Sequence, residues 1–187
     1  KVVHREKELG IWKSYTWNDF YHNVRLISLG LNKLGFTRGD KASILAEDCK
    51  EWIYADFAVQ CLGGVSTGVY TTDSSEQLLY QLTDSDSTFL FLDTDEQLDK
   101  YLTIAADCPK IKKAIVFERK DLFGFKHEKV IFLDEIYKIG EQALKKKPDL
   151  FETEISKNKA SDVAIMVYTS GTTGHPKGVM LTNENLI

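Results

Sequence analysis

The sequence predicts an α/β fold with a largely parallel sheet flanked by helices. Short apolar and aromatic runs, typical of strands, alternate with amphipathic helical patterns between residues 42 and 147. This alternation indicates crossover connections between parallel strands. The last predicted strand, residues 163–169, is apolar over most of its length, as expected where both faces of a strand are covered.

The first element is an amphipathic helix near the N-terminus. Thr16 and Asp19 match a capping pair, and apolar residues then recur at steps of three and four residues until Gly35. This stripe consists of Trp17, Phe20, Val24, Ile27, Leu31 and Leu34. Leu26 and Leu29 lie off the stripe, so we expect them on the exposed side of the helix, open to solvent or to a further part of the protein.

The remaining elements follow in alternation. Strands are predicted at residues 42–46, 65–70, 88–92, 114–117, 130–133 and 163–169. Helices are predicted at residues 51–62, 75–83, 95–106 and 134–147. The charged stretch 145–162 is expected to be a surface connection that returns the chain to the sheet.

Composition limits the class of protein. With 187 residues, 43% of them hydrophobic, the chain is long enough to bury one sizeable core. Its net charge is -4 and both signs are interspersed, which excludes the basic surface of a nucleic-acid-binding protein and gives no long-range attraction to an anionic membrane. The chain begins at Lys1 without a methionine and stops as a further helix is about to begin. We expect residues 1–187 to be an incomplete N-terminal α/β portion of a longer protein whose C-terminal domain is absent.

The other chemically active residue types predict no site of their own. Cys49, Cys61 and Cys108 are odd in number and lack C-x-x-C spacing, which argues against a disulfide framework or a zinc site and favours idle thiols in the cytosol. Aspartates flank Ser85 and Thr94, where turn and cap chemistry is the expected role. No histidine has a catalytic or metal-ligating partner at a diagnostic spacing, and these residues are His4, His22, His127 and His175.

The most informative segment is the run of residues 168–178, which directly follows the last apolar strand. It combines three glycines, four hydroxyl side chains and one lysine. Glycine lets backbone amides approach phosphate oxygens closely, while hydroxyl groups and an ammonium add donors and charge. The expected phosphate-binding residues are Thr169, Ser170, Gly171, Thr172, Thr173, Gly174 and Lys177, and Gly178 is expected to add backbone freedom.

The residues of this run argue against two other interpretations, a Walker A loop and a plain hairpin. A Walker A loop requires Gly-Lys-Ser/Thr followed at once by a helix, whereas Lys177 lies between Pro176 and Gly178, and residues 179–182 predict a strand. A plain Gly/Thr hairpin between two strands has no need of four hydroxyls and a lysine.

The run resembles the signature loop of the adenylate-forming superfamily, which includes acyl-CoA synthetases, aryl-CoA ligases, luciferase and the adenylation domains of peptide synthetases. Further similar segments occur upstream, namely Tyr15-Thr16-Trp17, Gly39-Asp40-Lys41-Ala42-Ser43-Ile44, Glu51-Trp52, Gly63-Gly64-Val65 and Gly68-Val69-Tyr70-Thr71-Thr72. The last of these, with Ser75-Glu76-Gln77-Leu78, is most similar to long-chain fatty acyl-CoA synthetases. Asn183 departs from the histidine that many members carry after the loop.

The resemblance implies the large N-terminal domain of an adenylate-forming enzyme and a two-step reaction. A fatty acid attacks the α-phosphate of ATP to give acyl-adenylate and pyrophosphate, and coenzyme A then displaces AMP. The loop would hold the β- and γ-phosphates, and Thr169 would help to bind Mg²⁺. The implied partners are therefore fatty acid, ATP and coenzyme A, in a cytoplasmic protein for which peripheral membrane contact is left open.

The later segments of the family are not found in this sequence. These are the aromatic-Gly-x-Thr-Glu segment beneath adenine, the Tyr-x-Thr-Gly-Asp segment on ribose, and the lysine of the mobile C-terminal domain. We therefore expect no catalytic residue within this chain and no turnover by it alone. An aryl-CoA ligase, a peptide-synthetase adenylation domain, a non-catalytic nucleotide-binding module and a purely structural piece remain as alternatives.

Overall fold

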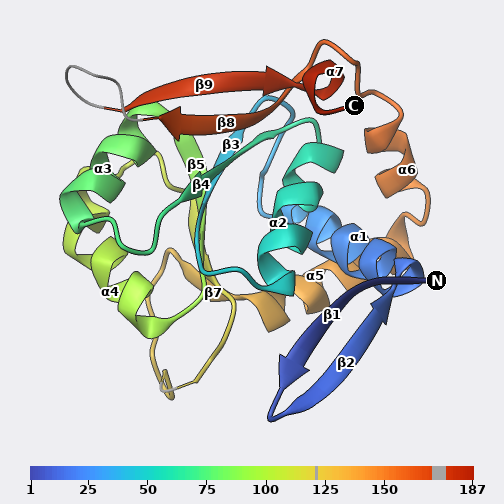
Figure 1. The fold of residues 1–187 in the computed structure, drawn as a ribbon, viewed down its shortest axis with the longest axis horizontal. Coiled ribbons are helices and arrows are strands. Elements are labelled where there is room, and N and C mark those ends of the chain that lie inside the picture. The colour runs from blue at the N-terminus through green and yellow to red at the C-terminus, as the bar shows by residue number, and fades with distance from the viewer. Residues whose placement is uncertain (121, 170–175) are drawn as a thin grey trace.

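A seven-stranded sheet forms the centre of the computed structural model, which describes residues 1–120, 122–169 and 176–187 (Figure 1). The strands lie in the order β7 (Val130–Phe132), β6 (Lys113–Val116), β5 (Ser87–Leu92), β3 (Lys41–Leu45), β4 (Val65–Val69), β8 (Val163–Thr169) and β9 (Lys177–Thr182). Neighbouring strands are parallel except for β9, which is antiparallel to β8. The largely parallel α/β fold predicted from the sequence is confirmed.

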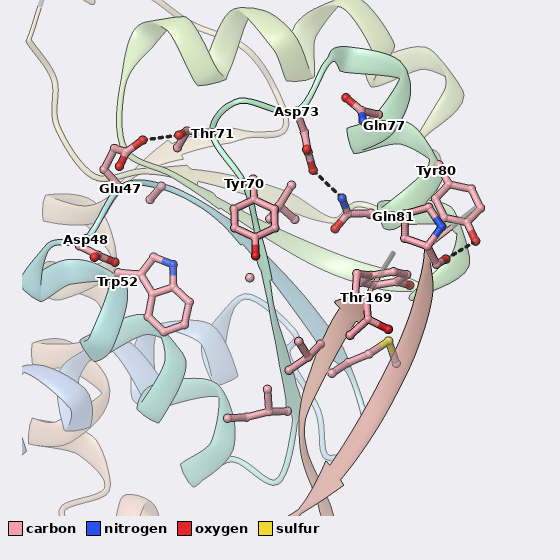
Figure 2. A pocket seen from close by; sticks show the side chains of 18 of the residues that line it. Glu47, Asp48, Trp52, Tyr70, Thr71, Asp73, Gln77, Tyr80, Gln81 and Thr169 are labelled. Atoms are coloured by element: carbon pink, nitrogen blue, oxygen red, sulfur yellow. Dashed lines mark hydrogen bonds between the residues drawn. The ribbon is translucent and has the colours of Figure 1, made fainter. Parts of the chain in front are cut away.

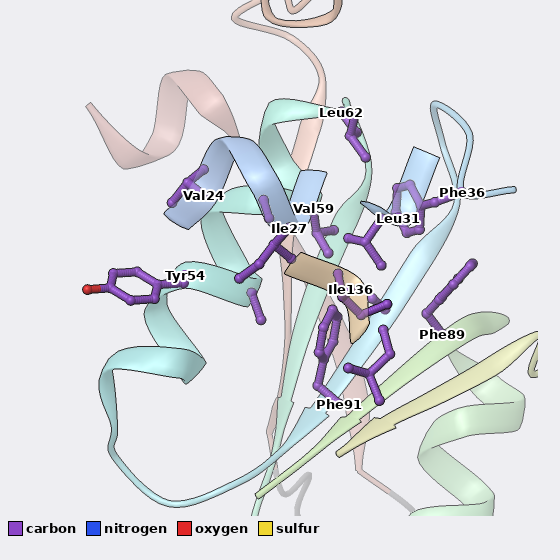
Figure 3. Close-up of a cluster of buried hydrophobic side chains, with 14 of the residues drawn as sticks. Val24, Ile27, Leu31, Phe36, Tyr54, Val59, Leu62, Phe89, Phe91 and Ile136 are labelled. Atoms are coloured by element: carbon purple, nitrogen blue, oxygen red, sulfur yellow. The ribbon is translucent and has the colours of Figure 1, made fainter. Parts of the chain in front are cut away.

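Helices cover both faces of this sheet. On one face lie α1 (Trp17–Lys33), α2 (Lys50–Cys61) and α5 (Leu133–Lys146), and on the other lie α3 (Ser75–Asp84) and α4 (Asp95–Ile104), which continues into the short η1 (Ala105–Asp107) (Figure 1). Figure 3 shows the first face, where Ile27 of α1 and Ile136 of α5 belong to the same buried cluster as Phe91 of β5. A second buried cluster lies on the opposite face, where Leu78 of α3 and Leu98 of α4 pack with Leu90 of β5. The central strands are therefore enclosed, which explains their continuous apolar runs.

The expectation for Leu26 and Leu29 is wrong, because both side chains are buried, with exposed fractions of 3% and 1%. The reason is that α5 lies across the side of α1 that the single stripe leaves uncovered. Two glycines allow this close approach. A Cβ added at Gly30 would lie 2.6 Å from Ile136 Cγ2, and one added at Gly140 would lie 2.1 Å from the carbonyl oxygen of Leu26.

Three elements were not predicted, namely α6, β1 and β2. The charged stretch after α5 contains α6 (Leu150–Ile155), which packs through the buried ring of Phe151 against Tyr21 at a centroid distance of 5.6 Å. A separate antiparallel hairpin, β1 (Val2–Glu8) and β2 (Ile11–Thr16), precedes α1. After β9 the chain enters the short helix α7 (Asn183–Leu186).

The local turn and cap predictions agree with the structure in part. Thr16 and Asp19 form the predicted capping box at the start of α1. Asp86 adopts a left-handed turn with φ +57°, as expected, but α4 is capped by Thr94 and not by an aspartate beside it, since Thr94 Oγ1 accepts a hydrogen bond from the Gln97 amide at 3.5 Å. Asp84 and Asp93 accept hydrogen bonds from Tyr168 and from the Glu47 amide instead. All three cysteines lie in the described part of the chain and are free thiols. Within the described ranges, no helix combines the length and the apolar character that crossing a membrane requires.

The close approach of α1 and α5 generates a stability prediction. We expect Gly140→Ala to lower the free energy of unfolding by about 1–3 kcal/mol, because the added methyl group overlaps a backbone oxygen that has no freedom to rotate away. Denaturant titration measures the loss. Gln142→Ala, at an exposed position on the same helix, is the matched control and should change stability by less than about 0.5 kcal/mol. Equal stability of the two variants would contradict the close contact.

A second prediction concerns Asp56 of α2, a buried carboxylate that accepts hydrogen bonds from Ser66 Oγ and from Gln60 Nε2, the latter at 2.8 Å. Burial raises the pKa of Asp56 above its ordinary value of 3.8. As the pH rises above that value, the Asp56 carboxyl group loses its proton first in the unfolded chain. The free energy of unfolding therefore falls until the pH passes the raised pKa that Asp56 has in the folded state.

Asp56→Asn removes this titration and keeps an oxygen that accepts a hydrogen bond. The free energy of unfolding of the variant should therefore rise relative to the wild type as the pH increases above about 4. Urea titrations at several pH values measure the difference. Gln142→Ala, at an exposed position of α5, removes no titratable group, so its difference from the wild type should be the same at every pH. A difference between wild type and Asp56→Asn that is constant with pH would rule out the raised pKa.

Candidate functional site

The candidate site is a crevice at the carboxyl ends of β3, β4 and β8. The chain leaves β3 for α2 on one face of the sheet and leaves β4 for α3 on the opposite face. Two neighbouring parallel strands whose helices diverge in this way leave a gap at their carboxyl ends, where open α/β sheets bind ligands. The gap contains a cavity with a volume of about 1010 Å³ (Figure 2).

The walls of the cavity come from both helices and from the strand ends. Trp52 of α2 faces Gly68 of β4, where an added Cβ would lie 3.3 Å from Trp52 Cζ2. The side chain of Tyr70, at the end of β4, lines the cavity and is 74% exposed, so it belongs to the crevice and not to the core. A bulky side chain at position 68 would occupy space beside the indole, so glycine keeps this wall open.

Hydrogen bonds fix the polar rim of the cavity (Figure 2). Thr71 Oγ1 donates to Glu47, which joins the end of β4 to the end of β3. Gln81 Nε2 of α3 donates to Asp73 Oδ2 at 2.6 Å. The backbone amide of Glu47 donates to Asp93 at 2.7 Å. The loops after three different strands are thus connected to one another before any ligand binds.

The run that is predicted to bind phosphate begins and ends at this rim. Thr169, the last residue of β8, pairs with Lys177, the first residue of β9, and both side chains are exposed. Directly opposed residues of an antiparallel pair point to the same side of the sheet, so the hydroxyl of Thr169 and the ammonium of Lys177 project together. Residues 170–175 lie outside the described part of the chain. The predicted roles of Ser170, Gly171, Thr172, Thr173 and Gly174 therefore stay predictions.

The role expected for Gly178 is wrong. Gly178 lies within β9 opposite Tyr168, and an added Cβ would lie 2.7 Å from Met166 Sδ and 3.4 Å from Tyr168 Cζ. The position therefore needs glycine because neighbouring side chains of β8 cross it. The prediction of a strand after Lys177 is confirmed by β9, and this strand excludes the helix that a Walker A loop requires.

Two tyrosines connect the described ends of the run to α3. Tyr80 Oη donates to the carbonyl oxygen of Pro176 at 2.8 Å, and Tyr168 Oη donates to Asp84 Oδ2 at 2.7 Å. The two rings meet edge to face with centroids 6.4 Å apart. Burial, together with the hydrogen bond to the Asp84 carboxylate, raises the pKa of Tyr168, so its hydroxyl stays protonated and able to donate. Neither residue of α3 was predicted to belong to the site, because both precede the run by more than 80 residues and Asp84 was expected only to close a turn.

Thr169 alone does not make a metal site. Among the described residues, no group of three or more His, Cys, Asp or Glu side chains is arranged to hold an ion. Magnesium prefers several oxygen ligands in octahedral geometry, and the exposed hydroxyl of Thr169 supplies one. The donor set therefore fits Mg²⁺ only if phosphate oxygens and groups outside the described residues complete it.

Known proteins match the chain over almost its full length. The AMP-binding enzyme family matches residues 2–187. The long-chain-fatty-acid–CoA ligase ACSBG1 of Bos taurus is 31% identical over 180 residues, which are 96% of this chain and 24% of that protein. The long-chain-fatty-acid–CoA ligase FadD15 of Mycobacterium bovis is 28% identical over 186 residues, which are 100% of this chain and 29% of that protein. The chain thus spans roughly a quarter of the length of these relatives.

A solved structure gives the same fold. The anthranilate CoA ligase AuaEII, crystallised in complex with anthranoyl-AMP, superposes with a TM-score of 0.76 at 21% identity, over 92% of this chain and 30% of that chain. At this identity the likeness concerns the fold, and the family assignment comes from the match in sequence. The resemblance noted in the sequence is confirmed, and the chain belongs to the AMP-binding enzyme family.

Proposed function

We propose that this chain is the N-terminal α/β portion of the AMP-binding domain of a long-chain fatty acid–CoA ligase. The observation that carries the proposal is the position of Thr169 and Lys177 at the carboxyl edge of the sheet, beside the 1010 Å³ crevice. Relatives named as long-chain-fatty-acid–CoA ligases, at about 30% identity, support the choice of substrate.

The proposed reaction has two steps. The carboxylate of a fatty acid attacks the α-phosphorus of ATP, and the bond from that phosphorus to the bridging oxygen breaks, which gives acyl-adenylate and pyrophosphate. The thiol of coenzyme A then attacks the acyl carbon and releases AMP. The products are acyl-CoA, AMP and pyrophosphate.

The described residues of this chain serve the first step by position and charge. Lys177 is exposed and lies opposite Thr169, which lines the crevice; its ammonium attracts the β- and γ-phosphates and opposes the negative charge that gathers on departing pyrophosphate. The hydroxyl of Thr169 is one ligand for Mg²⁺, which supplies further neutralisation of phosphate charge when bound. The hydrogen-bonded rim lowers the cost of organising the site, because its loops are already fixed.

Alternatives within and outside the enzyme class differ in their support. An aryl-CoA ligase is favoured only by likeness in fold, at 21% identity, to AuaEII. A non-catalytic nucleotide-binding module would bind ATP tightly without further segments, and a structural piece would bind no polyphosphate. As part of the same proposal, the free thiols support a reducing compartment such as the cytoplasm.

The role of Lys177 is testable on this chain. We expect weak binding of inorganic pyrophosphate in a calorimetric titration, and Lys177→Ala should weaken it by about tenfold or more, since a charge-assisted contact is lost. Lys145→Ala removes an exposed lysine at the end of α5 and is the charge-matched control, with little change expected. Equal affinity of wild type and Lys177→Ala would contradict the proposed phosphate site.

A second prediction concerns turnover. We expect the 187-residue chain to form no acyl-AMP and no acyl-CoA from ATP, fatty acid and coenzyme A, because the adenine, ribose and C-terminal lysine segments are not in this sequence. Mass spectrometry of the products measures this, with a mock preparation as the blank. Product formation above the blank would show that the chain carries a complete catalytic site.

A further inference from the structure

The carboxyl end of β8 and the start of β9 diverge from the rest of the sheet, because β4 continues to Val69 while its pairing with β8 ends at Met166. Strand β9 is at the edge and pairs with β8 alone. Strand β8 pairs with β4 only through Ile165 and Met166. Residues 167–169 of β8 and the residues opposite them, 177–179 of β9, therefore form a two-stranded ribbon.

A two-stranded ribbon in water is marginally stable by itself. Its end carries Thr169 and Lys177, the two described side chains of the proposed phosphate site. The ribbon should open and close easily unless another element anchors it. The anchor in this fold is α3, which approaches the ribbon from the side (Figure 1).

Helix α3 contacts both strands of the ribbon through tyrosine hydroxyl groups. Tyr80 of α3 donates to the Pro176 carbonyl, directly before β9, while Tyr168 of β8 donates to Asp84 of α3. We call these two hydrogen bonds the strand-end contacts. Each strand is fixed separately, at one residue from the Thr169–Lys177 pair, and the two residues of α3 are four apart and so lie on one face of the helix.

The aromatic rings of the two tyrosines also join α3 to the ribbon. Tyr80 and Tyr168 pack edge to face, and Gly178 leaves the space that the Tyr168 ring and Met166 occupy. Half-buried Tyr80 reaches the Pro176 carbonyl across the wall of the crevice (Figure 2). The position of each strand end thus depends on the helix that forms one wall of the ligand crevice.

We propose that Tyr80 and Asp84 are positioning residues that hold Thr169 and Lys177 at the spacing needed to bind the phosphate groups of ATP. This inference rests on the proposed function and adds two residues of α3 to the site. Neither residue touches the ligand in this proposal. They act on it through Pro176 and Tyr168.

The first test needs no ligand. Tyr80→Phe and Tyr168→Phe each delete one hydroxyl and keep the ring, so both variants should fold. Hydrogen exchange of the backbone amides in residues 167–169 and 177–179 should accelerate by about fivefold or more, while amides of β3 and β5 keep their rates. Unchanged exchange at the ribbon in both variants would overturn the proposal.

The second test measures pyrophosphate affinity by calorimetry. Asp84→Asn and Asp84→Ala remove the same charge, but asparagine keeps an oxygen that accepts the Tyr168 hydrogen bond. We expect Asp84→Ala to bind pyrophosphate at least about threefold more weakly than Asp84→Asn, and Tyr80→Phe to weaken binding similarly. A role confined to overall stability would not separate the two Asp84 variants at temperatures where both are folded.

Tyr21→Phe is the matched control, because the Tyr21 hydroxyl also donates to a carboxylate, that of Glu152, far from the crevice. It should alter neither ribbon exchange nor pyrophosphate affinity. If Lys177→Ala leaves affinity unchanged, the proposed function fails, and hydrogen exchange still decides whether the contacts anchor the ribbon. The positioning role is overturned, and the proposed function stands, if Lys177→Ala weakens pyrophosphate binding while Tyr80→Phe binds as tightly as the wild type and Asp84→Ala as tightly as Asp84→Asn.

Discussion

The site depends on one constraint, which is that β3 and β4 are adjacent and parallel but send their helices to opposite faces of the sheet. Helix α2 carries Trp52 to one side of the resulting gap and α3 carries Tyr80 to the other. Because these strands are parallel, the chain leaves both at the same edge of the sheet. Strands β4 and β5 lie on opposite sides of β3, so right-handed crossovers place α2 and α3 on opposite faces, and the gap opens where the loops meet. The backbone topology alone therefore selects the place for a ligand, and side chains then decide which ligand fits.

Dense packing elsewhere keeps that gap in place. The backbones of α1 and α5 approach so closely that Gly30 and Gly140 leave no room for a Cβ. Helix α1 is consequently buried both against α5 and against the cluster that includes Phe91 of β5 and Val59 of α2. Interiors packed at this density deform little, so α2 has a fixed position relative to β3 and Trp52 a fixed position relative to the crevice.

The sequence predicted the layers well and the contacts between distant segments poorly. Periodicity identified the helices and strands of the main sheet because burial on one or both faces leaves a local signature. The same reasoning failed for Leu26, since a stripe describes one neighbour and α1 has two. It also failed for α6, because its one buried residue, Phe151, stands in a sequence segment rich in charged residues and so leaves no apolar periodicity. The bond from Tyr80 to Pro176 spans 96 residues, and such a contact has no local pattern at all.

The absence of a helix directly after Lys177 has a physical consequence for anion binding. A Walker A loop draws on the partial positive charge of a helix N-terminus and on amides that the helix itself holds rigid. Here the run is followed by β9, and strands contribute only small net dipoles. The positive charge must then come from Lys177, and the rigidity must come from tertiary contacts. Anchoring both strand ends to α3 supplies that rigidity, which makes the helix on the wall of the crevice part of the phosphate site.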